Sequence, residues 1–93
     1  MPTVTVTAAD ANELRATLEY DAANGQMSGE PELEAAYDKL ETATFGGDAT
    51  VELREVDVTE LISALGYKAD NGQLDEDSLL AYERLEQATF SPA

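Results

Sequence analysis

Two short segments of the chain alternate strictly between polar and apolar residues, and each is followed by two stretches with apolar residues at helical spacing. The alternating segments are Thr3–Thr7 and Thr50–Arg54. A period of two residues predicts short strands with one apolar face. The residues on that face would be Val4, Val6, Val51 and Leu53. The expected order of elements is therefore β-α-α-β-α-α.

The chain contains an internal repeat. Residues 10–27 align with 57–74 at an offset of 47, with 9 identities in 18 positions. Residues 30–45 align with 75–90 at an offset of 45, with 7 identities in 16 positions. Two copies are too few for a solenoid. They indicate duplication of a unit that once formed a homodimer, which predicts a monomer with a pseudo-two-fold axis.

The duplication also predicts how the strands pair. A lone strand cannot satisfy its backbone groups, and two strands related by a two-fold axis pair antiparallel. A two-stranded ribbon is marginal alone, so the helices must supply most of the burial. We expect an α+β fold, with an antiparallel ribbon packed against four helices on one side. The chain would be one domain over 1–93, with units at 3–45 and 50–90 and a hinge at 46–49.

Capping residues mark the expected helix ends. Asp10 and Asp57, each followed three residues later by Glu, predict N-caps for the first helix of each unit. Asn24-Gly25 and Asn71-Gly72 predict where these helices end, because glycine adopts the left-handed C′ conformation without a steric penalty. The second helices would begin at Pro31, a favoured first helical residue, and after the cap Asp75.

Apolar residues three and four positions apart predict the buried face of each helix. In the first helices this face comprises Ala11, Leu14, Leu18 and Ala22, and Val58, Leu61, Ile62, Leu65 and Ala69. In the second helices it comprises Leu33, Tyr37, Leu40 and Thr44, and Leu79, Tyr82, Leu85 and Thr89. Arg15 stands where the second repeat has Ile62. We expect Phe45 and Phe90 to close the two units as hydrophobic plugs.

Two further tyrosines lie off these faces. Tyr20 and Tyr67 follow Leu18 and Leu65 by two residues. We expect each to pack partly beneath the opposite repeat. The alternative is that they contribute to a protein-binding surface, for which aromatic residues with a polar end are well suited.

The net charge of the chain indicates a halophilic protein rather than an ordinary small domain. The 93 residues include 20 acidic and 5 basic side chains, a net charge of −15. With 43% hydrophobic residues and clear periodicity, disorder is not expected. A composition with few lysines and many carboxylates resembles that of proteins from haloarchaea that accumulate salt. At molar salt the Debye length is about 3 Å, which suppresses the repulsion between carboxylates. Alternatives are a DNA-mimicking acidic protein and a mesophilic acidic interaction protein.

The layout resembles the ribbon-helix-helix proteins of the Arc and MetJ repressor type, as a fused dimer. The most similar stretch is 57–72 with the helix after it. The segment 70–75, Asp-Asn-Gly-Gln-Leu-Asp, is also similar to small acidic haloarchaeal proteins of unknown function. The repressor resemblance implies that outward strand residues read bases and that the second helix meets a phosphate at its N-terminus. The matching outward residues are Thr3, Thr5, Thr7, Thr50, Glu52 and Arg54.

The sequence departs from that family where phosphate would bind. The second helices open with Glu30 and Glu32 in one unit and with Asp75, Glu76 and Asp77 in the other. Carboxylates there complement the helix dipole themselves. With five basic residues, the gain from releasing counterions of DNA is small.

Catalytic chemistry has few possible carriers in this chain. The absence of Cys and His excludes disulfides, thiolate nucleophiles, Cys/His zinc sites and a histidine base. The run 75–77 lacks the ligand spacing of a calcium loop, and the alternating Glu30, Glu32 and Glu34 indicate a solvated face. Every carboxylate is expected at a cap, a turn or an outer face, so no buried acid is available. We expect no enzyme activity, no cofactor and no metal.

The sequence therefore predicts a non-catalytic protein-interaction domain of a halophilic cell. No signal peptide or membrane span is expected, which favours a cytoplasmic location without a membrane partner. The partner would be a protein, with a second copy of this chain as one candidate, bound through Tyr20 and Tyr67. The alternative is a DNA-binding transcription regulator adapted to high salt, which would use Thr5, Thr7, Glu52 and Arg54.

Overall fold

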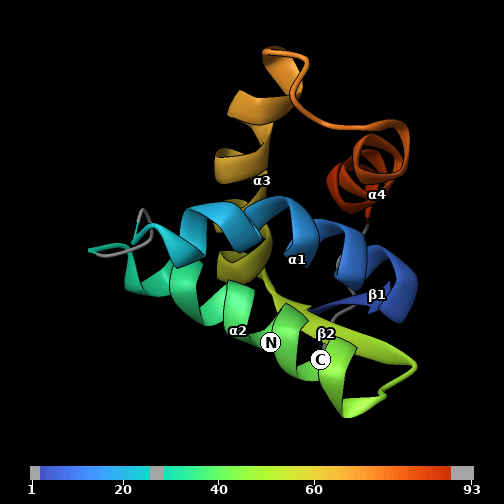
Figure 1. Ribbon diagram of the computed structural model, residues 1–93. Coiled ribbons are helices and arrows are strands. Elements are labelled where there is room, and N and C mark those ends of the chain that lie inside the picture. The colour runs from blue at the N-terminus through green and yellow to red at the C-terminus, as the bar shows by residue number, and fades with distance from the viewer. Residues whose placement is uncertain (1–2, 26–28, 89–93) are drawn as a thin grey trace.

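The fold is an α+β arrangement in which a two-stranded ribbon packs against four helices (Figure 1). The computed structural model describes residues 3–25 and 29–88, to which all structural statements refer. The elements are β1 (Thr3–Thr7), α1 (Ala8–Ala23), α2 (Pro31–Gly46), β2 (Thr50–Arg54), α3 (Glu55–Asp70) and α4 (Glu76–Gln87). The predicted class, the order of elements and both strand ranges are confirmed.

The register of the ribbon reveals the pseudo-two-fold axis. Strands β1 and β2 pair antiparallel, and the central pair is Thr5 with Glu52. These two residues are equivalent in the repeat at an offset of 47, so the axis passes through this pair. On either side of this pair the inward-facing residues are buried except for Val51, which is partly exposed; they are Val4, Val6, Val51 and Leu53. The ribbon is thus shared equally by the two repeats.

The first helices begin three residues earlier than predicted. Helices α1 and α3 follow the strands without a loop, so the last strand residue is the N-cap and Asp10 and Asp57 stand at the third helical position. Thr7 Oγ1 accepts a hydrogen bond from the backbone N–H of Asp10 at 3.2 Å. The backbone N–H of Arg54 donates to Asp57 Oδ2 at 2.9 Å. The assignment of the two aspartates as N-caps is wrong, because the strands themselves supply the caps.

The first helices end alike, as the sequence predicts. Gly25 and Gly72 have φ angles of 73° and 67°, the left-handed conformation that glycine adopts without strain. The side-chain amides of Asn24 and Asn71 each donate to the carbonyl four residues earlier, both at 2.7 Å. The same Asn-Gly pair thus ends the first helix in both repeats.

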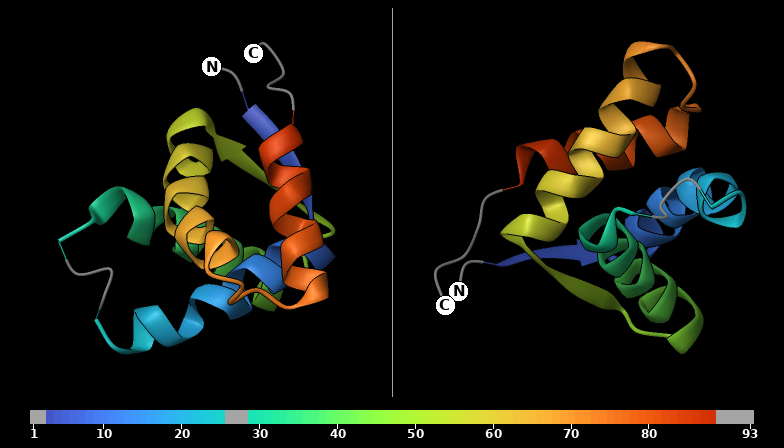
Figure 2. Two further views of the ribbon diagram at one scale, coloured as in Figure 1. Left: turned by 90° about the horizontal axis from the view of Figure 1, so that it is seen from above. Right: turned by 90° about the vertical axis from the view of Figure 1, so that its left-hand side faces the viewer.

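The repeats are interlocked rather than side by side. Helix α2 packs on α3 and helix α4 packs on α1, so each second helix covers the first helix of the other repeat. In the right-hand view of Figure 2 the ribbon lies beneath α3 and α4. One core joins all six elements; its largest fully buried apolar side chains are Leu14, Leu18, Leu40, Leu53, Leu61 and Leu65. Within the described residues no helix is both long and apolar enough to cross a membrane.

Helix α4 is rotated relative to the prediction. Its buried residues are Ser78, Ala81, Tyr82 and Leu85, whereas Leu79 is 38% exposed. Ser78 faces α1, where its Oγ accepts a hydrogen bond from Thr17 Oγ1 at 3.0 Å. This polar contact takes the inner position that the sequence assigned to Leu79, so that assignment is wrong. The predicted Thr89 lies outside the described residues.

Phe45 is not a hydrophobic plug. Its side chain is 70% exposed, and the guanidinium carbon of Arg15 lies 4.9 Å from its ring centroid. The cation therefore lies over one face of the ring, to which the guanidinium is attracted electrostatically. Phe90, predicted to play the same role in the second repeat, lies outside the described residues.

Candidate interaction surfaces

Two ion pairs connect the repeats at equivalent positions. Lys39 Nζ on α2 lies 2.7 Å from Asp57 Oδ2 on α3, and Arg84 Nη1 on α4 lies 2.7 Å from Asp10 Oδ1 on α1. Lys39 and Arg84 are equivalent in the repeat, as are the two aspartates. Each second helix is therefore tied by a cation to the first turn of the other repeat's first helix. Sequence analysis missed these pairs, although the aligned charges signalled them.

Asp57 is the one acidic residue of the described chain that is fully buried. Its Oδ2 accepts from Lys39 Nζ, from the Arg54 backbone N–H and from Arg54 Nε, and its Oδ1 accepts from Arg54 Nη2 at 3.1 Å. Burial by itself would raise the pKa of Asp57, but the hydrogen bonds from Arg54 and Lys39 outweigh it and lower the pKa to about 2. The expectation that every carboxylate lies at a cap, a turn or an outer face is wrong here.

The outward face of the ribbon carries the four residues considered for DNA. Thr5, Thr7, Glu52 and Arg54 are all exposed. The guanidinium of Arg54, however, donates twice to Asp57, so its hydrogen-bonding capacity is directed at its own chain. Glu52 places a negative charge at the centre of the ribbon.

The N-terminus of α4 already binds a carboxylate of its own chain. The Oδ1 atom of Asp75 accepts from the Ser78 backbone N–H at 2.8 Å. This hydrogen bond lowers the pKa of Asp75. An incoming phosphate would have to displace that carboxylate.

Tyr20 and Tyr67 are exposed at equivalent positions. Their exposed fractions are 71% and 70%, so the expectation that they pack beneath the opposite repeat is wrong. Two residues correspond to about 200° around a helix, which turns each tyrosine away from the buried leucine before it. Tyr37 and Tyr82, by contrast, are buried as predicted, at 7% and 9% exposure.

An ion pair between the repeats lies next to these tyrosines along the chain. Asp21 and Lys68, which follow Tyr20 and Tyr67, are equivalent in the repeat. Lys68 Nζ lies 3.2 Å from Asp21 Oδ2. The pair links α1 to α3 near the ends at which the tyrosines are exposed. We call Tyr20 and Tyr67 the tyrosine surface.

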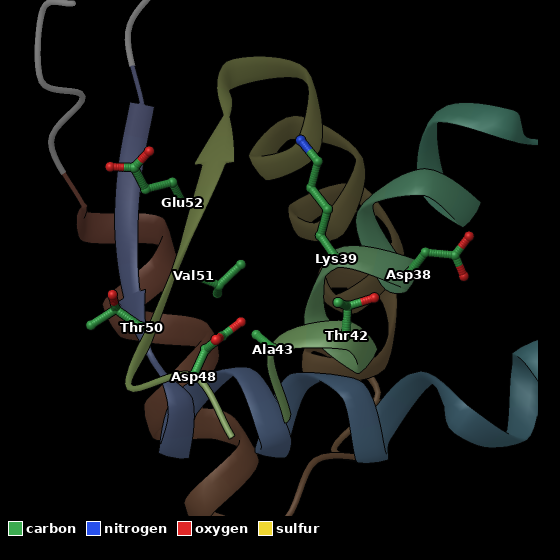
Figure 3. Close-up of a pocket in the computed structure, with 8 residues that line it drawn as sticks. All are labelled: Asp38, Lys39, Thr42, Ala43, Asp48, Thr50, Val51 and Glu52. Carbon is green, nitrogen blue, oxygen red and sulfur yellow. The ribbon is translucent and has the colours of Figure 1, made fainter. Parts of the chain in front are cut away.

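A groove of about 480 Å³ lies between α2 and β2 (Figure 3). It is lined by Asp38, Lys39, Thr42, Ala43, Asp48, Thr50, Val51 and Glu52. In Figure 3 Val51 points from the strand towards α2, while Glu52 points to the opposite side of the strand. The equivalent groove between α4 and β1 is smaller, at about 230 Å³, and contains Arg84 and Asp10. We call the larger one the α2–β2 groove.

A third, polar pocket of about 260 Å³ lies between α1, α3 and α4. It is lined by Glu13, Ala16, Thr17, Lys68, Gln73, Asp75 and Ser78. Among residues 3–25 and 29–88 no three acidic side chains converge closely enough to hold a metal ion. The hydroxyls of Thr17 and Ser78 hydrogen-bond to each other, which links α1 to α4. The pocket thus surrounds a structural contact between the repeats.

Comparison of the chain with protein-family models, with curated proteins and with solved structures gave no match. The structure therefore shows the layout of this chain, an antiparallel ribbon with two helices after each strand, and the comparisons assign it to no family. A layout alone does not determine function.

Proposed function

We propose that this chain is a non-catalytic protein-interaction domain that works in concentrated salt and binds a protein partner through the tyrosine surface. The supporting observation is that Tyr20 and Tyr67 occupy equivalent positions and are both about 70% exposed. Tyrosine combines a large apolar ring with a polar end and is enriched among residues that dominate binding energy. Two equivalent tyrosines suit a two-fold symmetric partner or a second copy of this chain.

The distribution of charge supports a salt-rich setting. All acidic residues except Asp57 are at least partly exposed. Each of the five basic residues forms an ion pair within the chain. The excess of exposed carboxylates repels itself at low ionic strength and is screened at molar salt. We expect thermal stability, followed by circular dichroism, to rise steeply from low to molar KCl; equal stability in both would contradict the halophilic part of the proposal.

Affinity capture at molar KCl tests the binding part. The wild-type chain is compared with the double variant Tyr20→Ala/Tyr67→Ala and with the control Leu80→Ala, which removes an exposed apolar side chain from α4. We expect a protein partner that the wild type and the control retain and the double variant loses. A partner retained equally by all three chains would contradict the role of the tyrosine surface.

A DNA-binding transcription regulator is the second candidate, and one observation favours it. Thr5 and Thr7 are exposed on the outward face of the ribbon, where the resembling family reads bases. Sequencing of nucleic acid recovered in the same capture tests this candidate. Enrichment of a specific DNA sequence by the wild type, lost on Thr5→Ala/Thr7→Ala, would replace the protein-interaction proposal.

A further inference from the structure

The α2–β2 groove opens onto the free edge of the ribbon. Strand β2 pairs with β1 along one edge, and no other strand of the described chain pairs with its second edge. The groove is lined by Thr50 and Glu52 from the outward face and by Val51 from the inward face. A groove that reaches both faces of one strand lies along its edge, where backbone groups are available to another strand.

Val51 gives the groove an apolar wall that is more exposed than the equivalent residue of the smaller groove. Val51 is partly exposed, whereas its equivalent Val4 is 3% exposed. Ala43 on α2 lines the same groove, and Figure 3 shows Val51 pointing into the space between the strand and this helix. A small apolar side chain inserted there would cover Val51, which gains about 25 cal/mol for each Å² of apolar surface removed from water.

The charge around the groove is negative. Asp38, Asp48 and Glu52 line it and are exposed. Its basic residue, Lys39, has its ammonium group 2.7 Å from Asp57, which neutralises it. Figure 3 shows the Asp48 carboxylate beside the strand edge and Glu52 on the outward face of the strand. A strand added at this edge would therefore meet carboxylates on its outward side and Val51 on its inward side.

We infer that the α2–β2 groove binds an extended basic peptide segment, which adds to β2 as a third strand. Alternate side chains of such a segment point to opposite faces. Lysine or arginine at outward positions lies next to Glu52, and small apolar residues at inward positions cover Val51. Main-chain hydrogen bonds to the free edge supply the affinity, as in other cases of strand addition. A second copy of this chain does not supply such a strand to the groove, because each of its five basic residues already forms an ion pair within the chain.

This inference goes beyond the proposed function, because it uses a different surface. Tyr20 and Tyr67 each lie 12 residues after the first residue of a helix that begins at the ribbon. At about 1.5 Å per residue, that is about 18 Å along the helix axis from the ribbon end. Loss of one surface therefore leaves the other intact.

Fluorescence anisotropy with defined peptides tests the inference. The probe is a labelled seven-residue peptide that alternates lysine and valine, and the comparison peptide alternates glutamate and valine. Binding is measured at the lowest KCl concentration at which circular dichroism shows the native helix content. We expect the lysine peptide to bind at least tenfold more tightly, and N-methylation of alternate backbone nitrogens to abolish its binding. Absence of saturable binding, or unchanged binding of the N-methylated peptide, would overturn the inference.

Matched variants separate the groove from general charge attraction. Asp48→Asn/Glu52→Gln removes two carboxylates at the groove, and Asp77→Asn/Glu83→Gln removes two exposed carboxylates from α4. We expect at least a fivefold loss of affinity for the first variant and less than a twofold loss for the second. Equal losses would show that the peptide responds only to net charge and would overturn the inference.

Amide hydrogen exchange locates the bound peptide. We expect added protection of backbone amides within Thr50–Glu52, both in the wild type and in Tyr67→Ala. Protection confined to other elements, or a peptide-free dimer in sedimentation experiments that protects these same amides, would overturn the inference. Because Tyr67→Ala changes the tyrosine surface and not the groove, protection in this variant separates failure of the groove from failure of the tyrosine surface.

Discussion

The two repeats hold a carboxylate at the same place but in different surroundings. Asp10 and Asp57 are each the third residue of a first helix and each binds a cation from the other repeat's second helix. The Asp57 side chain is 0% exposed and receives hydrogen bonds from two basic residues, whereas that of Asp10 is 14% exposed and its partner Arg84 is 62% exposed.

The difference originates in the residue that precedes each helix. Thr7 caps α1 with its own hydroxyl, while Arg54 at the equivalent position directs its guanidinium to Asp57. A buried carboxylate persists only when paired and hydrogen-bonded, because desolvation of a lone charge costs several kcal/mol. The two repeats thus share a geometry but distribute their electrostatic stabilisation unequally.

The largest effect should come from removing the two carboxylates in turn. Asp57→Ala leaves Lys39 and Arg54 without their shared acceptor and should lower the free energy of unfolding by about 3 kcal/mol. Asp10→Ala breaks a more exposed pair and should cost about 0.5 kcal/mol. Urea unfolding in molar KCl measures both. Equal losses would show that burial does not distinguish the two sites.

The difference in pH dependence between wild type and Asp57→Asn should isolate Asp57, because Asp75, whose pKa is also lowered, is present in both proteins. The folded pKa of Asp57, about 2, lies below its ordinary value of 3.8, so the folded state holds the ionised form more strongly. The stability it contributes is fully present above pH 4 and is lost as pH falls through about 2. Wild type should therefore lose about 2 kcal/mol more than Asp57→Asn across this window. Parallel stability curves for the two proteins would contradict the assignment.

Where the repeats are locally identical, substitutions should cost the same in both. Gly25→Ala and Gly72→Ala place a Cβ on residues with positive φ, and no heavy atom beyond the adjacent residues lies within 4 Å of either Cβ position. The cost is therefore backbone strain alone, about 1 kcal/mol at each site. Thermal unfolding of the two variants should give closely matched melting temperatures. If the losses in the free energy of unfolding differed by more than about 1 kcal/mol, the two helix ends would not be equivalent.

The smallest predicted difference between the repeats is the effect of salt on the coupling energies of their two ion pairs. Double-mutant cycles for Lys39 with Asp57 and for Arg84 with Asp10 measure the coupling within each pair. Raising KCl to molar concentration should remove the coupling of Arg84 with Asp10, about 0.5 kcal/mol, and leave most of the other. Equal salt sensitivity would show that Asp57 is no better shielded than Asp10.

The parts of the fold that depend on local pattern were predictable. Both strand ranges and the Asn-Gly helix ends follow from periodicity and from the backbone freedom of glycine. The helix starts were displaced because Asp10 and Asp57 have the chemistry of an N-cap, while the structure uses them at the third helical position. An aspartate at the N-cap and an aspartate at the third helical position differ here only in whether a loop follows the strand. The sequence pattern does not encode the absence of that loop.

The candidate surfaces depended on contacts between distant segments. Ser78 displaces Leu79 from the core through a hydrogen bond to Thr17, 61 residues away. The burial of Asp57 requires Lys39 from another helix. The α2–β2 groove exists because α2 stands beside the strand edge. The exposure of Tyr20 and Tyr67 was open to prediction from helix geometry alone, since both lie opposite a buried leucine.

The position of the pseudo-two-fold axis has a consequence for how the repeats could diverge. A symmetric dimer of the second repeat would place Glu52 directly opposite its own copy, and like charges facing each other across a ribbon are destabilising. In the fused chain the residue opposite Glu52 is Thr5. Because the two repeats are covalently linked, the two residues on the pseudo-two-fold axis can differ. One of them, Glu52, carries a charge while the other, Thr5, is neutral. A residue that a homodimer would have to exclude thereby becomes acceptable, and it lies beside the free edge of β2.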